Sequence, residues 1–132
     1  MAYEIGIINV WGTGDPIIPG DGTISSEGWY YLSVSAVQET FAQHNGCNVD
    51  EGPTTIETSS DGIKDWQCTG YEIGCTNDAY TIQCNYNGRH QYPKSNPNLP
   101  NSPNFALPVV WDYFKKFQRI VPSSNSTGNY TK

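Results

Sequence analysis

The chain alternates apolar stretches with stretches rich in glycine, proline and polar residues. Residues 4–11, EIGIINVW, form an apolar run with several β-branched side chains, and this run predicts a buried strand. Residues 12–22, GTGDPIIPGDG, combine glycine, proline and aspartate. They therefore predict a loop that directly follows the first strand.

A helix is predicted over residues 31–45. The apolar positions that share one face of this helix are Val34, Val37 and Phe41. Ser35 and Gln38 have the spacing of a capping box at its start. Gly46 is suited to end it, because glycine adopts the left-handed conformation at little cost.

The middle of the chain predicts two strands with irregular structure between them. Residues 53–60, PTTIETSS, alternate and contain β-type residues, and residues 79–87, AYTIQCNYN, form a second strand-like run. The intervening segment, DGIKDWQCTGYEIGCTNDA, predicts a loop or a hairpin.

The last part of the chain predicts a loop, a helix and a tail. Residues 93–104, PKSNPNLPNSPN, hold four of the nine prolines and predict a long surface loop. Residues 105–120 predict a helix with Pro108 in its first turn. The residues near one face of this helix are Leu107, Trp111, Phe114 and Phe117. Residues 122–132 predict a disordered polar tail.

The predicted elements occur in the order β, α, β, β, α. Strands that alternate with helices indicate an α/β fold with a mostly parallel sheet and flanking helices. In such sheets, functional residues gather in loops beyond the carboxyl ends of the strands. The loops that hold Asp15 and His90 both follow a predicted strand, so we expect them at the same edge of the sheet.

Composition and charge favour a globular chain and exclude two classes of partner. Of the 132 residues, 36% are hydrophobic and 13% are aromatic, which suits one domain with a core. Seven Lys and Arg against thirteen Asp and Glu give a net charge of −6, so we expect neither a nucleic-acid nor an anionic-membrane partner. No run approaches the ~18 apolar residues of a membrane span.

Several features predict a secreted glycoprotein. The chain is acidic, contains four cysteines, and has N-glycosylation sequons at Asn125 and Asn129. Its first residues, MAYEIGIINVWGTG, lack the basic and apolar regions of a signal peptide. We therefore expect that sequence upstream of Met1 is missing.

The cysteines, at positions 47, 68, 75 and 84, allow three disulfide connectivities. A Cys68–Cys75 bond would close a short loop, and a Cys47–Cys84 bond would tie the end of a helix to the end of a strand. Zinc is the weaker interpretation, because neither a C-x2-4-C pair nor a finger-type histidine spacing is present. Four buried free thiols are the alternative for a reducing compartment.

Asp15 and His90 are the candidates for acid–base chemistry. A carboxylate beside an imidazole fixes the tautomer of the ring and stabilises the imidazolium, so that the histidine can take a proton from a nucleophile. Taken singly, Asp15 is as well explained as an Asp-Pro turn residue, and His90 as a solvated loop residue. His44 ends a predicted helix, where a cation suits the helix dipole, so a structural role is expected for it.

The nucleophile of such a triad is missing from the sequence. A serine nucleophile on a strand-to-helix elbow has the pattern G-x-S-x-G, which does not occur in the 132 residues. Ser33 and Ser35 lie inside the predicted helix, without flanking glycines, and come after Asp15. The chain therefore offers an acid and a base but nothing for them to activate, which leaves open whether it is itself an enzyme.

Five ordered blocks resemble one protein family. The blocks are IINVWGTGDPIIP, WYYLSVSAVQETFAQHNGC, CTGYEIGC, YTIQCNYNGRHQYP and ALPVVWDYFKKF, and the resemblance covers about residues 5–117. They resemble the C-terminal half of secreted α/β-hydrolase esterases, the group of feruloyl esterases, acetylxylan esterases and polyhydroxybutyrate depolymerase-like enzymes. Two positions depart from the family pattern, Trp11 and Arg89, and neither departure removes a catalytic group.

The resemblance implies roles for particular residues. It implies that residues 1–121 are the C-terminal part of a single, incomplete α/β-hydrolase domain, that Asp15 is the triad acid and His90 the triad base, and that the cysteines pair as disulfides. No metal or other cofactor is implied. Trp11, Trp29 and Tyr92 are candidates for lining the substrate cleft.

The resemblance also implies a substrate and a partner. The substrate would be an acyl or feruloyl ester on plant polysaccharide, or a polyester, and the partner would be the missing N-terminal half of the domain. Two other functions stay open from the sequence. One is a non-catalytic secreted module whose Tyr and Trp side chains bind carbohydrate, and the other is an inactive pseudoenzyme.

Overall fold

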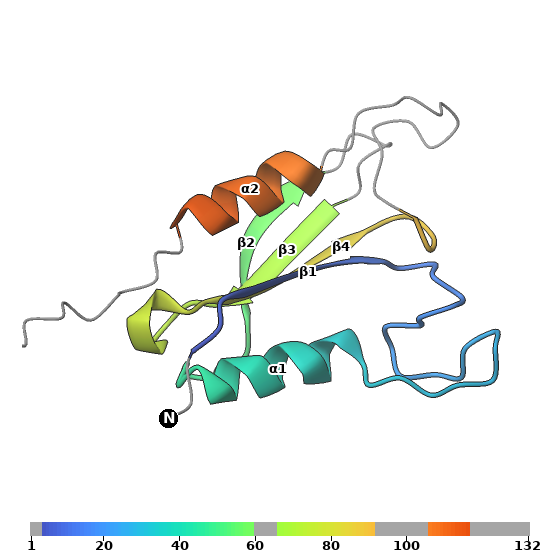
Figure 1. The fold of residues 1–132 in the computed structure, drawn as a ribbon, viewed down its shortest axis with the longest axis horizontal. Coiled ribbons are helices and arrows are strands. Elements are labelled where there is room, and N and C mark those ends of the chain that lie inside the picture. The colour runs from blue at the N-terminus through green and yellow to red at the C-terminus, as the bar shows by residue number, and fades with distance from the viewer. Residues whose placement is uncertain (1–3, 60–65, 92–105, 117–132) are drawn as a thin grey trace, which may run out of the picture.

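The computed structural model describes residues 4–59, 66–91 and 106–116. Figure 1 shows four strands and two α-helices in these ranges. The elements are β1 (Ile7–Gly12), α1 (Val34–His44), β2 (Thr54–Ser59), β3 (Trp66–Tyr71), β4 (Thr81–Tyr86) and α2 (Ala106–Lys116), with a short 3-10 helix at Thr76–Asp78.

The four strands form one mixed sheet in the order β1-β4-β3-β2. β1 and β4 are parallel, whereas β3 is antiparallel to both β4 and β2. The prediction of a mostly parallel α/β-hydrolase sheet with flanking helices was therefore wrong. A parallel neighbour needs a crossover of about a dozen residues or more. Only residues 72–80 separate β3 from β4, which is too few for such a crossover.

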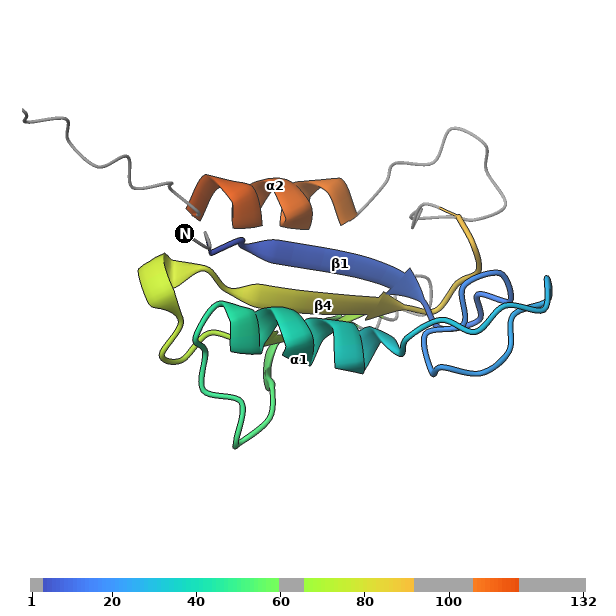
Figure 2. The same ribbon diagram turned by 60° about the horizontal axis from the view of Figure 1, so that its bottom comes forward.

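The parallel pair sets the position of the candidate site. Its register runs from Ile7 opposite Thr81 to Gly12 opposite Tyr86, so both strands end at the same edge of the sheet. The expectation that the loops after these strands share one edge is confirmed. α1 lies on one side of the sheet and α2 on the other, as the two views of the ribbon show (Figures 1 and 2).

α1 begins and ends close to the predicted positions, but its cap differs. Ser33 is the N-cap, and its Oγ accepts a hydrogen bond from the Ala36 backbone N–H at 3.2 Å, so the predicted capping box at Ser35 was wrong. Gly46 has φ +71° and follows the last turn, as predicted. On the buried face, Gln38 Nε2 donates to the Thr69 carbonyl at 3.0 Å and thereby joins the helix to the sheet.

Asn45 ties three parts of the fold together just after α1. Its side chain is fully buried, and its Nδ2 donates to the carbonyls of Ile5 at 2.7 Å and Ala79 at 2.8 Å. Its Oδ1 accepts a hydrogen bond from the Ile5 N–H at 3.0 Å. A buried amide is stable only when its polar atoms are paired, and here they pair with the segments that precede β1 and β4.

All four cysteines are in disulfides, Cys47–Cys75 and Cys68–Cys84. Neither bond is one of the two considered from the sequence, which were Cys68–Cys75 and Cys47–Cys84. Cys68 and Cys84 are direct cross-strand partners on β3 and β4, a relationship that was hidden because β3 was not predicted as a strand. Each disulfide lies in its own cluster of buried residues.

α2 packs on the sheet through a different face from the one predicted. Ala106 and Tyr113 are buried, and the Tyr113 hydroxyl donates to the Tyr80 carbonyl at 2.6 Å. The predicted apolar face is instead exposed at Leu107, Trp111 and Phe114. Phe117, the loop at 93–104 and the tail at 122–132 lie outside the described residues. Neither described helix has the length and apolar character needed to cross a bilayer.

Candidate acid–base site

Asp15 and His90 lie side by side although 75 positions separate them in the sequence. His90 Nδ1 is 2.8 Å from Asp15 Oδ2. The Asp15 side chain is 7% exposed and the His90 side chain is 48% exposed. A buried carboxylate thus holds one nitrogen of a ring whose other side reaches solvent, which is the arrangement that an acid–base pair requires.

The pair forms because the two loops that carry it continue the contact between β1 and β4. Beyond the strands, the Thr13 N–H donates to the Tyr86 carbonyl and the Gly14 N–H donates to the Gly88 carbonyl, each at 2.9 Å. A Cβ on Gly12 would lie 2.6 Å from the Gly88 carbonyl oxygen. Gly12 is therefore needed for the close approach of the two backbones.

Three hydrogen bonds hold the Asp15 carboxylate. Its Oδ1 accepts from the backbone N–H groups of Ile17 at 2.9 Å and Ile18 at 3.0 Å, while Oδ2 faces His90. Burial alone would raise the pKa of Asp15, but the hydrogen bonds from Ile18, His90 and Ile17 outweigh it and lower the pKa below the ordinary value. Asp15 is therefore ionised at neutral pH.

The Tyr86 side chain holds the loop of His90 in place. The Tyr86 hydroxyl donates to the Arg89 carbonyl at 2.7 Å and also contacts the Gln91 carbonyl. Gly88 has room only for hydrogen at its Cα, because a Cβ there would run into the Tyr86 ring. Tyr86 was not predicted as a positioning residue. A tyrosine at the end of a buried strand, whose hydroxyl must find a partner, was the available signal.

None of the described residues provides a nucleophile for His90. Over this part of the chain, His90 Nε2 makes no hydrogen bond, and the cysteines are all oxidised. The Oγ atoms of Ser25 and Ser33 accept backbone N–H groups in turns and caps. The pair is therefore positioned to accept a proton from a group that approaches Nε2 from outside.

The predicted aromatic candidates have different environments. Trp11 is half-buried at the end of β1, and its Nε1 donates to the Ile18 carbonyl at 3.1 Å, so it supports the Asp15 loop. Trp29 is 65% exposed. Tyr92, Asn125 and Asn129 lie outside the described residues. In the part of the chain that the structure describes, no group of three or more potential metal ligands is present.

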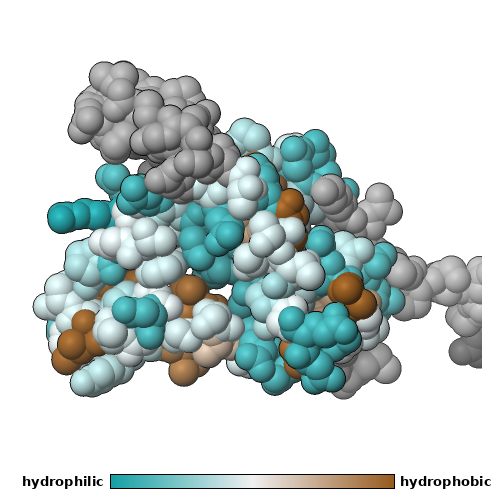
Figure 3. Space-filling view, turned by 180° about the vertical axis from the view of Figure 1, so that it is seen from behind, coloured by the Kyte–Doolittle hydropathy of each residue, from teal (hydrophilic) through white to brown (hydrophobic). Residues whose placement is uncertain are grey.

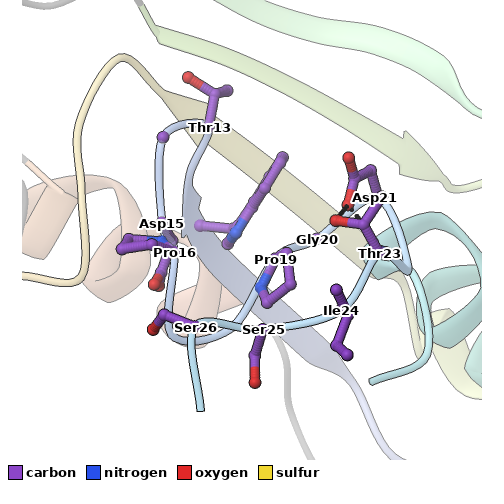
Figure 4. A pocket seen from close by; sticks show the side chains of 12 residues that line it. Thr13, Asp15, Pro16, Pro19, Gly20, Asp21, Thr23, Ile24, Ser25 and Ser26 are labelled. Carbon is purple, nitrogen blue, oxygen red and sulfur yellow. Dashed lines mark hydrogen bonds between the residues drawn. The ribbon is translucent and has the colours of Figure 1, made fainter. Parts of the chain in front are cut away.

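A cavity that was not predicted from the sequence adjoins the pair on the side of Asp15. The β1–α1 loop (residues 13–33) surrounds a space of about 420 Å³. Figure 4 shows Asp15 and Pro16 at one side of this space, Asp21 and Thr23 at the other, and Pro19 between them. The rest of the lining mixes apolar residues, among them Trp11 and Ile24, with the polar residues Thr13, Ser25 and Ser26.

Comparison with known proteins found no matching family model, no matching curated protein and no matching solved structure.

Proposed function

We propose that Asp15 and His90 are the acid and the base of a serine carboxylic ester hydrolase whose nucleophile lies outside this chain. The observation that carries the proposal is the 2.8 Å contact between Asp15 Oδ2 and His90 Nδ1, with Nε2 unpaired among the described residues. The resemblance of GTGD and NGRH to the triad segments of secreted esterases supports the same assignment.

The chemistry follows from the orientation of the ring. With Nδ1–H donating to Asp15, Nε2 is the free acceptor and takes the proton as the serine oxygen attacks the ester carbonyl. Asp15 stabilises the imidazolium that forms. When the bond to the alcohol breaks, Nε2 returns the proton to the leaving oxygen, and water then repeats the cycle on the acyl group.

The serine would belong to a polypeptide that packs beside β1. β1 forms one edge of the sheet over the described residues, and its apolar residues Ile7, Ile8 and Val10 are only half-buried. An apolar edge strand favours pairing with another chain segment. Asp15 follows the carboxyl end of this strand, so a polypeptide bound there would approach the Asp15–His90 pair.

The substrate class rests on the resemblance, and the compartment rests on the disulfides. We propose an acyl or feruloyl ester on polysaccharide, or a polyester, as the substrate of the completed site. Two disulfides suit an oxidising environment, so the proposed location is extracellular, with Asn125 and Asn129 as glycosylation sites.

An esterase assay tests the proposal. The chain alone should release p-nitrophenol from p-nitrophenyl acetate no faster than the Asp15→Asn, His90→Ala double variant does. Adding the polypeptide encoded directly upstream in the source gene should produce hydrolysis, and Asp15→Asn should lower its kcat by about 10⁴-fold. Hydrolysis by the chain alone that the double variant loses would place the nucleophile within it. Hydrolysis that is insensitive to both substitutions would refute the assigned roles.

A further inference from the structure

We propose that the cavity of the β1–α1 loop binds one unit of a neutral saccharide and that the exposed rings of Trp29 and Tyr30 stack on an adjacent unit. The inference deepens the proposed function, because it assigns a place to the alcohol part of a polysaccharide ester. It rests on that function only for the link between binding and hydrolysis. The binding itself requires no nucleophile.

The lining of the cavity supplies the groups that bind sugar hydroxyls. Asp21 Oδ1 accepts from the Thr23 N–H at 3.0 Å and the Thr23 hydroxyl at 2.7 Å, which fixes the carboxylate at the cavity. The Asp21 carboxylate and the oxygen of the Thr23 hydroxyl can accept further hydrogen bonds, which the hydroxyl groups of a polyol donate.

Charge and size argue against other ligands. Two carboxylates, Asp15 and Asp21, line the space, so an anion would be repelled. A bound divalent cation commonly needs several carboxylate or histidine ligands, and the described residues contain no group of three. The lining is mixed, with two carboxylates among apolar residues such as Trp11 and Ile24, so it does not suit a purely apolar molecule. A volume of about 420 Å³ lies within the usual range for small-molecule sites.

The aromatic tip of the same loop is held in a fixed position beside the cavity. The Ser25 N–H donates to the Trp29 carbonyl at 2.8 Å, and the Trp29 N–H donates to Ser25 Oγ at 3.0 Å. Tyr30 forms a β-bridge with Ile24, which itself lines the cavity. The backbone that carries Trp29 and Tyr30 is therefore anchored to residues that line the cavity.

Exposure distinguishes these rings from core residues. Trp29 is 65% exposed and Tyr30 is 76% exposed, although hydrogen bonds order the backbone that carries them. In the view from behind, the loop side at the lower left shows apolar residues among polar ones (Figure 3). Exposed aromatic faces next to a polar cavity match the two sides of a sugar ring, whose C–H face stacks and whose hydroxyls form hydrogen bonds.

Indole NMR signals of the whole chain test the proposal. The chain has four tryptophans, so each of the four Nε1–H signals reports on a different part of the structure. Titration with xylohexaose and cellohexaose should shift the signals of Trp11 and Trp29, while those of Trp66 and Trp111 stay unchanged. No shift at saturating oligosaccharide, or equal shifts of Trp29 and Trp111, would overturn the proposal. Shifts produced by Ca²⁺ alone and not by either sugar would overturn it as well.

Two variants and a matched control localise the binding. Trp29→Ala should weaken the oligosaccharide affinity about tenfold, and Asp21→Asn should weaken it about fivefold. Trp111 is also 65% exposed but lies on α2, so Trp111→Ala should leave the affinity unchanged. Amide spectra would show that each variant is folded. If Trp29→Ala and Trp111→Ala bind equally well, the assigned site is wrong.

The outcomes also separate this proposal from the proposed function. Oligosaccharide binding without any hydrolysis in the combined assay would leave the saccharide site standing and count against the acid–base roles. Hydrolysis of p-nitrophenyl acetate without oligosaccharide binding would leave the Asp15–His90 roles standing and refute the saccharide site.

Discussion

Gly12 and Gly88 lie so close that a Cβ on Gly12 would stand 2.6 Å from the Gly88 carbonyl oxygen. Gly12 ends β1, and Gly88 follows β4 in the loop that leads to His90. Their contact lets the two loops run side by side, which brings the carboxylate of Asp15 to the ring of His90. The spacing of the acid–base pair therefore depends on two residues that have no functional side chain.

We predict that Gly12→Ala separates the pair. The added methyl group would collide with backbone atoms, which cannot rotate away, so the loops must move at a cost of about 1–3 kcal/mol. Gly14→Ala is the matched control, because its nearest atom would be 3.3 Å away. Urea unfolding and the His90 ring signals would measure both effects. Equal effects of the two substitutions would contradict this explanation.

Asn45→Ala should be among the most destabilising single substitutions in the chain. It leaves the Ile5 N–H and the carbonyls of Ile5 and Ala79 without their partner. The Ala79 group is buried, and a buried unpaired group costs about 1–3 kcal/mol. Asn48→Ala removes one exposed turn hydrogen bond, to the Asp50 N–H, and should cost well under 1 kcal/mol. Urea denaturation of both variants measures the difference, and a mild effect at Asn45 would show that the network contributes little.

The disulfide connectivity makes a prediction of its own. Peptide mapping under non-reducing conditions should find Cys47 linked to Cys75 and Cys68 linked to Cys84. With sequence separations of 28 and 16 residues, replacing each pair by alanine should cost about 3.5 and about 3 kcal/mol respectively. Recovery of a peptide that links Cys68 to Cys75 would contradict the pairing of β3 with β4.

The lowered pKa of Asp15 predicts how its contribution to stability depends on pH. The unfolded chain takes up a proton at Asp15 near the ordinary value of about pH 4, whereas the folded chain does so only at lower pH. The contribution of Asp15 is therefore complete above about pH 4 and is lost as the pH falls through the folded pKa. The difference in free energy of unfolding between wild type and Asp15→Asn should shrink between pH 6 and pH 2. A constant difference over this range would contradict the assignment.

The sequence predicted the proximity of Asp15 and His90 better than it predicted the sheet. Asp15 and His90 could be paired from sequence because each follows an apolar strand-like run, and β1 and β4 are indeed parallel neighbours. The antiparallel β3 could not be predicted, because Trp66–Tyr71 contains two polar residues, a glycine and a cysteine, and has little of the usual apolar pattern. Its burial comes from the cross-strand contacts and the Cys68–Cys84 bond, which only the tertiary structure supplies.

Other features depended on contacts that no local pattern encodes. α2 has apolar residues on two faces, and periodicity alone selected the face of Leu107, Trp111 and Phe114, which is exposed. The cavity of the β1–α1 loop arises because Ser25, Asp15 and Trp11 each hold a different part of the loop by hydrogen bonds. The sequence predicts a loop there, but the shape of the loop depends on these bonds.

The most direct test of the central claim is the tautomer of the neutral His90 ring, measured by ¹⁵N–¹H NMR. In the wild type the proton should sit on Nδ1 and point at Asp15, which leaves Nε2 as a proton acceptor. In Asp15→Asn the amide oxygen should keep the bonds to Ile17 and Ile18, so its NH₂ group faces His90 and moves the proton to Nε2. His44 serves as the internal control. A His90 tautomer that is the same in both proteins, or a ring that behaves like His44, would contradict the acid–base pair.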